Sequence, residues 1–150
     1  MKRIKPLLAL AVCALTATRG GRVPDAQAGS DPGFLVVVNA ANGHPPMSPS
    51  ELKKAYTGGT KLWPNGVAVQ TGIAATDAPE MKYLASVLDV SPNELVARMQ
   101  QQVFKGEMRR PAVLRSSSDC VALARSTPGA ICIVASGTPL TPDTRAVAVR

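Results

Sequence analysis

Histidine, cysteine and aromatic residues are scarce in this 150-residue chain. It has one histidine and no Cys-x-x-Cys pair, which excludes the usual ligand sets of a protein zinc site. The single histidine, His44, lies in a His-Pro-Pro loop that is expected to face solvent. No nucleophile stands beside a base, and no carboxylate pair lies in a cleft motif. We therefore predict that the protein is not an enzyme and that it carries no cofactor and no metal.

Aromatic residues make up 3% of the chain, so it lacks a stacking platform for bases. The formal charge of +7 does not indicate a nucleic-acid-binding surface either, because part of it lies in the N-terminal segment. Five of the 17 basic and one of the 10 acidic residues fall in the first 28 positions, which leaves 12 and 9 in the rest. The core must then be aliphatic, with Tyr56, Trp63, Tyr83 and Phe104 as structural anchors.

Long hydrophobic runs are also missing, and the first 28 residues have the pattern of a secretory signal peptide. A basic head, Met1 to Lys5, precedes an apolar run of about ten residues, half of the roughly 20 needed to span a bilayer. Ala26-Gln27-Ala28 supplies small residues before a cleavage point. We predict a signal peptide at 1–28, an exported periplasmic protein without a stable membrane span, and one domain at 29–150. Lipid attachment at Cys13 is a weaker alternative, because a small residue is expected before that cysteine.

Apolar patterns in the remainder predict an α/β fold in which strands and helices alternate. Ser-Pro pairs at 48–49 and 91–92, each with a glutamate near the first turn, are typical of helix starts. A tight turn is expected at Trp63-Pro64-Asn65-Gly66. Strands are expected at 34–38, 67–71, 111–114, 130–135 and 145–149, and helices from 48 to before Gly58, from near Asp77, from 91 to Gly106 and over 118–125.

Cys120 and Cys132 fall in a predicted helix and in the strand that follows it. An exported compartment permits a disulfide between them. Spacing alone does not establish that the two side chains can meet, so two buried thiols are the preferred interpretation and a bridge is the alternative.

Several motifs together resemble the phosphate-binding-protein-like family of type 2 periplasmic solute-binding proteins. They are VVVNAAN at 36–42, WPNG at 63–66, Gln102-x-Phe104-x-Gly106 and TPGAI at 127–131. The resemblance covers residues 34–135 and one lobe of a two-lobed fold. It implies a single-lobe domain with a mixed sheet flanked by helices. Relatives bind a small anion, such as phosphate, in the cleft between their lobes.

The resemblance places the candidate ligand site between the strand at 67–71 and the helix that begins near Asp77. Ligands of such sheets lie beyond the carboxyl ends of strands, where helix N-termini attract anions. The candidate ligand-binding residues are Asn39, Thr71, Thr76, Asp77 and Lys82. Relatives carry an arginine where this chain has Thr71. We expect Asp77 and Glu80 to cap the helix and to repel an anion, so that any binding is weak.

The alternative function is a periplasmic protein-interaction module without a small-molecule ligand. It would dock a protein of the periplasm or of a membrane complex through Trp63, Phe104 and a basic cluster. That cluster consists of Lys105, Arg109, Arg110 and Arg115. Both rings are nevertheless expected to serve as core anchors.

Overall fold

The computed structural model describes residues 33–43 and 46–150, so the signal peptide predicted at 1–28 lies outside the described residues. None of the helices in these two ranges has the length and apolar character needed to cross a membrane. In chain order the elements are β1 (Phe34–Asn39), a 3-10 turn (Ala40–Asn42), α1 (Pro49–Tyr56), β2 (Gln70–Ile73), α2 (Pro79–Val87), α3 (Pro92–Phe104), β3 (Ala112–Val113), α4 (Ser117–Ser126), β4 (Ala130–Ala135) and β5 (Thr144–Val147).

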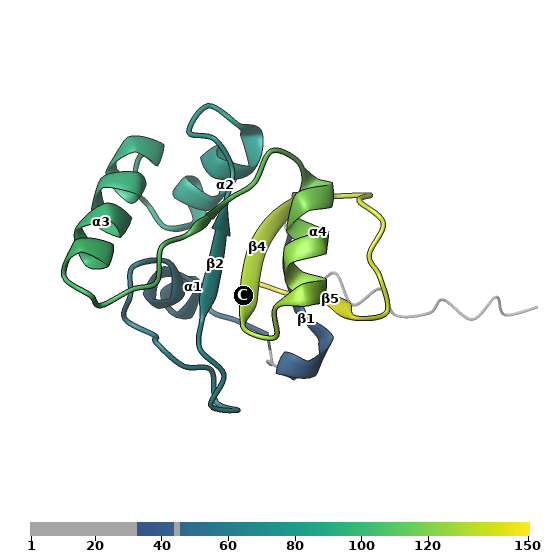
Figure 1. The fold of residues 1–150 in the computed structure, drawn as a ribbon. Helices are drawn as coiled ribbons and strands as arrows, with labels where there is room; N and C mark the ends of the chain where they lie inside the picture. The colour runs from purple at the N-terminus through teal and green to yellow at the C-terminus, as the bar shows by residue number, and fades with distance from the viewer. Residues whose placement is uncertain (1–32, 44–45) are drawn as a thin grey trace, which may run out of the picture.

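The described strands form one mixed sheet in the order β3-β2-β4-β1-β5. β2 runs parallel to β3 and β4, whereas β1 runs antiparallel to β4 and β5. Helix α4 covers one face of the sheet, and α1, α2 and α3 lie on the other side (Figure 1). The predicted mixed α/β architecture is confirmed.

Two hydrophobic clusters, one on each face, explain the uninterrupted apolar run of β1. Successive side chains of a strand point to opposite faces. Val36 and Val38 accordingly join the cluster beneath α1, α2 and α3, while Val37 joins the cluster beneath α4. All three are buried, so each of these three positions requires an apolar side chain.

Three of the four α-helices in the described part of the chain begin at a serine whose side chain accepts a hydrogen bond from a backbone N–H, as the sequence patterns predict for α1 and α3. These residues are Ser48, Ser91 and Ser116. Helix α2 differs, because its N-cap residue is Ala78 and no side chain caps it. The expected cap by Asp77 and Glu80 is therefore wrong. Asp77 stands one position too early to serve as the cap, and the Glu80 carboxylate accepts a hydrogen bond from the Ser117 hydroxyl at 3.3 Å.

Strand β2 begins three residues later than the pattern predicts. The residues before it form a small hairpin across the WPNG turn, in which Trp63 N–H donates to Val67 O and Val69 N–H donates to Lys61 O, at 2.8 and 3.0 Å. Gly66 takes a positive φ of 81° in this turn, as an Asn-Gly pair favours. The apolar residues at 67–69 thus pair locally before the chain enters the main sheet.

The expectation of aromatic anchors holds for Tyr56, Trp63 and Tyr83, which are buried, and fails for Phe104. Trp63 Nε1 donates to Gly129 O at 2.9 Å. Burial raises the pKa of the Tyr56 phenol, whose hydroxyl donates to backbone oxygens of the sheet. Phe104 is 93% exposed. It follows Met99 by five positions, which turns it away from the buried stripe of α3.

Cys120 and Cys132 form a disulfide between α4 and β4, with their Cα atoms 5.9 Å apart. The preferred interpretation of two free thiols is therefore wrong. Helix α4 packs directly on β4, which brings the two positions into the range that a disulfide spans. Both residues are fully buried, so the bond lies within the cluster beneath α4.

Candidate functional site

The five residues predicted to bind a ligand do not come together in the structure. Only Thr71 lines one of the three cavities described here. Thr76, Asp77 and Lys82 are exposed, the first two in the turn that follows β2 and the third on α2. The predicted junction therefore does not form one pocket that contains them all.

Asn39 has a structural role that its position at the end of β1 did not reveal. Its Nδ2 donates to the backbone oxygens of Ala124 and Arg125 at 2.7 and 3.3 Å, and its Oδ1 accepts from Ala41 N–H at 2.8 Å. These bonds fasten the end of β1 to the C-terminal turn of α4, where backbone carbonyls lack partners within the helix. Since both ends of the amide are engaged, Asn39 is not available to a ligand.

A cavity of about 320 Å³ lies where the sequence predicted the site, beyond the carboxyl ends of β2 and β3. Its lining includes Ala78 and Glu80 of the α2 start and Ser116 and Ser117 of the α4 start. Ser116 already caps α4 by accepting from Asp119 N–H at 3.2 Å. One cation, Arg115, also lines this cavity, but the Glu80 carboxylate lines it too and repels anions. This cavity is therefore a poor anion site, although the N-terminus of α2 has no side-chain cap.

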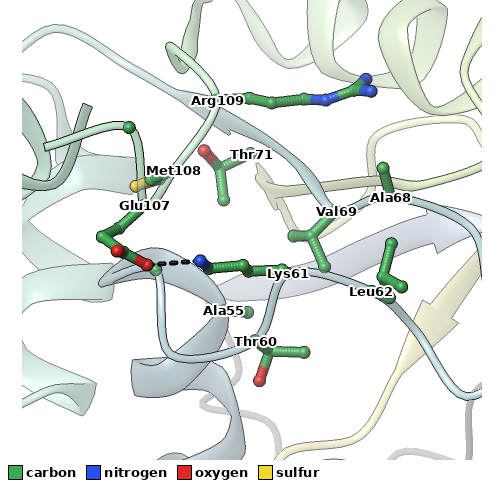
Figure 2. Close-up of a pocket in the computed structure, with 12 residues that line it drawn as sticks. Ala55, Thr60, Lys61, Leu62, Ala68, Val69, Thr71, Glu107, Met108 and Arg109 are labelled. Atoms are coloured by element: carbon green, nitrogen blue, oxygen red, sulfur yellow. Dashed lines mark ion pairs between the residues drawn. The ribbon is translucent and has the colours of Figure 1, made fainter. Parts of the chain in front are cut away.

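Thr71 lies instead in a second cavity of about 290 Å³, which we call the Thr71 cavity. It is formed by the end of α1, the segment 58–62, residues 68–69 and the segment 106–109 between α3 and β3. Figure 2 shows Thr71 in the middle of these side chains. Thr71 is 2% exposed, and its Oγ1 has no hydrogen-bond partner among the described residues. A buried hydroxyl without a partner costs free energy, which marks this atom as a place for a bound molecule or water.

Two cations line the Thr71 cavity, and one of them is already paired. Lys61 Nζ forms an ion pair with the Glu107 carboxylate (Figure 2). The hydrogen bond and charge of Lys61 hold the pKa of Glu107 below its usual value. Arg109 also lines the cavity and is exposed. The cavity is thus lined by an unpartnered hydroxyl, by the cationic residues Arg109 and Lys61 and by one carboxylate. In Figure 2 the Arg109 guanidinium points away from the Lys61–Glu107 pair.

Lys61 and Arg109 were not among the predicted ligand residues. Arg109 was recognised only as part of a basic cluster, and nothing in the local sequence of Lys61 sets it apart from other surface lysines. They line the same cavity through the tertiary fold, because the segments before β2 and before β3 lie side by side when these strands pair. Within residues 33–43 and 46–150, no group of three or more histidine, cysteine, aspartate or glutamate residues could hold a metal ion.

No family model and no curated protein matches the sequence. The structure is similar to that of an ABC-type phosphate transport receptor from Vibrio cholerae, with a TM-score of 0.59 and 16% identity over 77% of this chain and 45% of that chain. It is also similar to PstS from Borrelia burgdorferi, with a TM-score of 0.57 and 12% identity over 79% of this chain and 47% of that chain.

The chain spans less than half the length of these two proteins. At such low identity the likeness is one of fold, and function has to be argued from the site residues themselves. The chain therefore shares the α/β fold of part of these two proteins, with the predicted mixed sheet flanked by helices.

Proposed function

We propose that the protein is an exported solute-binding-like protein that binds a small oxyanion, such as phosphate, weakly in the Thr71 cavity. The observation that supports this proposal is the buried Thr71 hydroxyl. It has no hydrogen-bond partner among the described residues and lies in a cavity that Arg109 and Lys61 also line. Phosphate and sulfate accept hydrogen bonds from hydroxyl groups and from the cationic side chains of lysine and arginine. The similar solved structure from Vibrio cholerae is described as a phosphate transport receptor, which favours the same ligand class.

Weak affinity follows from the exposure of the two cations. Arg109 and Lys61 are both exposed, so water and salt screen their attraction for an anion. Glu107 further reduces the positive charge at this position. We expect dissociation constants from micromolar to millimolar.

Isothermal titration of the purified protein with phosphate, sulfate and molybdate tests this proposal. We expect measurable heat and a rise in melting temperature at millimolar anion. If the titration gives no heat and the melting temperature does not rise at that concentration, small-anion binding is excluded as a function. Recovery of the protein from the periplasmic fraction, with its N-terminus near Gly29, tests export separately.

Replacing Thr71 with valine should raise stability and lower anion affinity at the same time. The change removes a buried hydroxyl that has no partner, which we expect to increase the free energy of unfolding by about 1 kcal/mol. It also removes a donor to the anion, which should weaken binding roughly tenfold. Thermal denaturation and titration on the same preparations measure both effects.

The matched control is Thr76→Val in the exposed turn after β2. It should leave affinity unchanged if the Thr71 cavity holds the anion, and it should lower affinity if the site lies at the originally predicted junction. A Thr71→Val protein that loses stability and keeps its affinity would show that the hydroxyl is held by structural water instead.

Replacing Glu107 with glutamine should strengthen anion binding. The change keeps the side-chain size, removes a negative charge and releases Lys61 from its ion pair. For such exposed groups we expect an increase of roughly two- to fivefold at low salt, which disappears at high salt. Glu94→Gln, which breaks the Arg98 pair on α3, is the control and should have no effect.

The pH dependence of this effect has a defined sign. Because the pKa of Glu107 is lowered, its carboxylate stays charged until the pH falls below the ordinary range for glutamate. Wild-type affinity for sulfate should therefore rise only at strongly acidic pH, and that rise should be absent in Glu107→Gln. An equal rise in both proteins would contradict a role for this carboxylate.

A further inference from the structure

An apolar groove of about 660 Å³ lies between α3 and the edge strand β3. It is the largest of the three cavities described here, and seven of its nine lining residues are apolar. Val96, Val103 and Phe104 line it from α3, and Pro111 and Val113 line it from the β3 segment. The groove is separate from the Thr71 cavity, since no residue lines both.

Two large apolar side chains that line this groove are exposed to solvent. Phe104 is 93% exposed and Val113 is 74% exposed, which makes them the most exposed large hydrophobic residues of the described chain. The other four aromatic rings, those of Phe34, Tyr56, Trp63 and Tyr83, are buried in or packed against the core. Adjacent exposed apolar residues around a concave surface are characteristic of an interaction site.

The backbone of β3 offers hydrogen bonds along the same groove. In the described sheet β3 is an edge strand that pairs only with β2. Leu114 N–H donates to Ile73 O at 2.8 Å. Backbone groups alternate in direction along a strand, so those of Val113 face the open edge. An extended segment lying in the groove could pair with this edge.

Cationic residues stand at both ends of β3, and one of them lines the groove. Arg110 lines the groove before the strand. Arg115 follows the strand and lines the neighbouring cavity beyond β2 and β3, and Lys105 and Arg109 add two further exposed cations. Between residues 104 and 119 the acids are Glu107, which is paired with Lys61 outside the groove, and Asp119, whose carboxylate accepts a hydrogen bond from the Arg115 backbone N–H at 3.0 Å. The charge of this surface therefore complements an acidic partner.

We propose that this groove docks an extended segment of another protein in which an apolar residue is flanked by carboxylates. The apolar residue lies against Phe104 and Val113, the carboxylates reach Arg110 and Arg115, and the main chain follows β3. A second copy of the chain is a poor occupant, because a two-fold contact would bring the two cationic surfaces together. A lipid surface is also a poor occupant, because it neither fills a concave groove nor pairs with a strand edge.

The experiment uses a library of random 12-residue peptides, selected against the purified full chain. Selected peptides are synthesised with a fluorescent label, and their affinities are measured by fluorescence anisotropy. We expect the selected peptides to share an apolar residue flanked by aspartate or glutamate. Phe104→Ala and Arg110→Glu should each weaken their binding about tenfold or more. Both residues are exposed, so the variants should fold as the wild type does.

The controls place the same chemical changes elsewhere. Leu140→Ala truncates an exposed apolar side chain outside the groove, and Arg125→Glu reverses a charge on α4; neither should change peptide affinity.

The proposal is overturned if the selection yields no peptide, if the peptides lack acidic residues, or if Phe104→Ala binds them as the wild type does. Phe104-dependent sedimentation with phosphatidylglycerol vesicles, without any selected peptide, would overturn it in favour of a lipid surface. Anion titration of Phe104→Ala should match the wild type, which separates this test from that of the Thr71 cavity.

Discussion

Replacing Gly129 with alanine is expected to cause the largest loss of stability of any change described here. A Cβ atom at this position would overlap the backbone oxygen of Ala68, and backbone cannot move aside as a flexible side chain can. Gly129 also accepts hydrogen bonds from Trp63 Nε1 and Gln70 N–H, both at 2.9 Å, so displacing it disturbs the start of β2 as well. We expect a loss on the order of 4 kcal/mol or more, measured by urea denaturation followed by circular dichroism.

Gly33→Ala is the matched control for this prediction. A Cβ atom at Gly33 would meet nothing within 4 Å, so stability should change by no more than about 0.5 kcal/mol. A Gly129→Ala protein with wild-type stability would show that Ala68 and Gly129 do not approach as closely as described. The close approach would then not explain why glycine stands in the TPGAI motif.

Removing the disulfide should give the second large loss of stability. Cys120 and Cys132 are 12 positions apart, and closing a loop of this size stabilises a protein by about 3 kcal/mol in the chain-entropy account. We expect the double variant Cys120→Ala and Cys132→Ala to lose about this amount, with a further contribution from the lost packing beneath α4. Thermal denaturation of both proteins measures the difference.

Reducing agent provides the control within the same experiment. Dithiothreitol should lower the melting temperature of the wild-type protein towards that of the double variant and leave the variant unchanged. A wild-type protein that is insensitive to dithiothreitol after unfolding and refolding in its presence would show that the bond contributes little. Mass spectrometry under non-reducing conditions verifies that the bond is formed.

The role of Gly129 also explains why the motif resemblance predicted the fold better than the site. Gly129 allows two segments to approach, and Trp63 of the WPNG motif hydrogen-bonds to the oxygen of that same glycine. Asn39 of the VVVNAAN motif holds α4 against β1. These motif residues preserve contacts inside the fold, so they indicate its architecture. They carry little information about a ligand.

Local sequence determined the strands, most helix starts and the mixed α/β class, because apolar periodicity and serine caps act over a few residues. Ser48, Ser91 and the apolar run of β1 are the clearest cases. The start of β2 was shifted by the hairpin at 61–69, which forms through pairing that periodicity does not encode.

Tertiary structure alone decided the features on which the functional proposals rest. Whether Cys120 meets Cys132, whether Phe104 is buried, and which cations accompany Thr71 all depend on how separate segments pack together. A disulfide requires two Cα atoms at the right distance, and a cavity requires side chains from several loops. Such distances between remote positions are set by the assembled sheet and its helices, and the local patterns of the chain do not contain them.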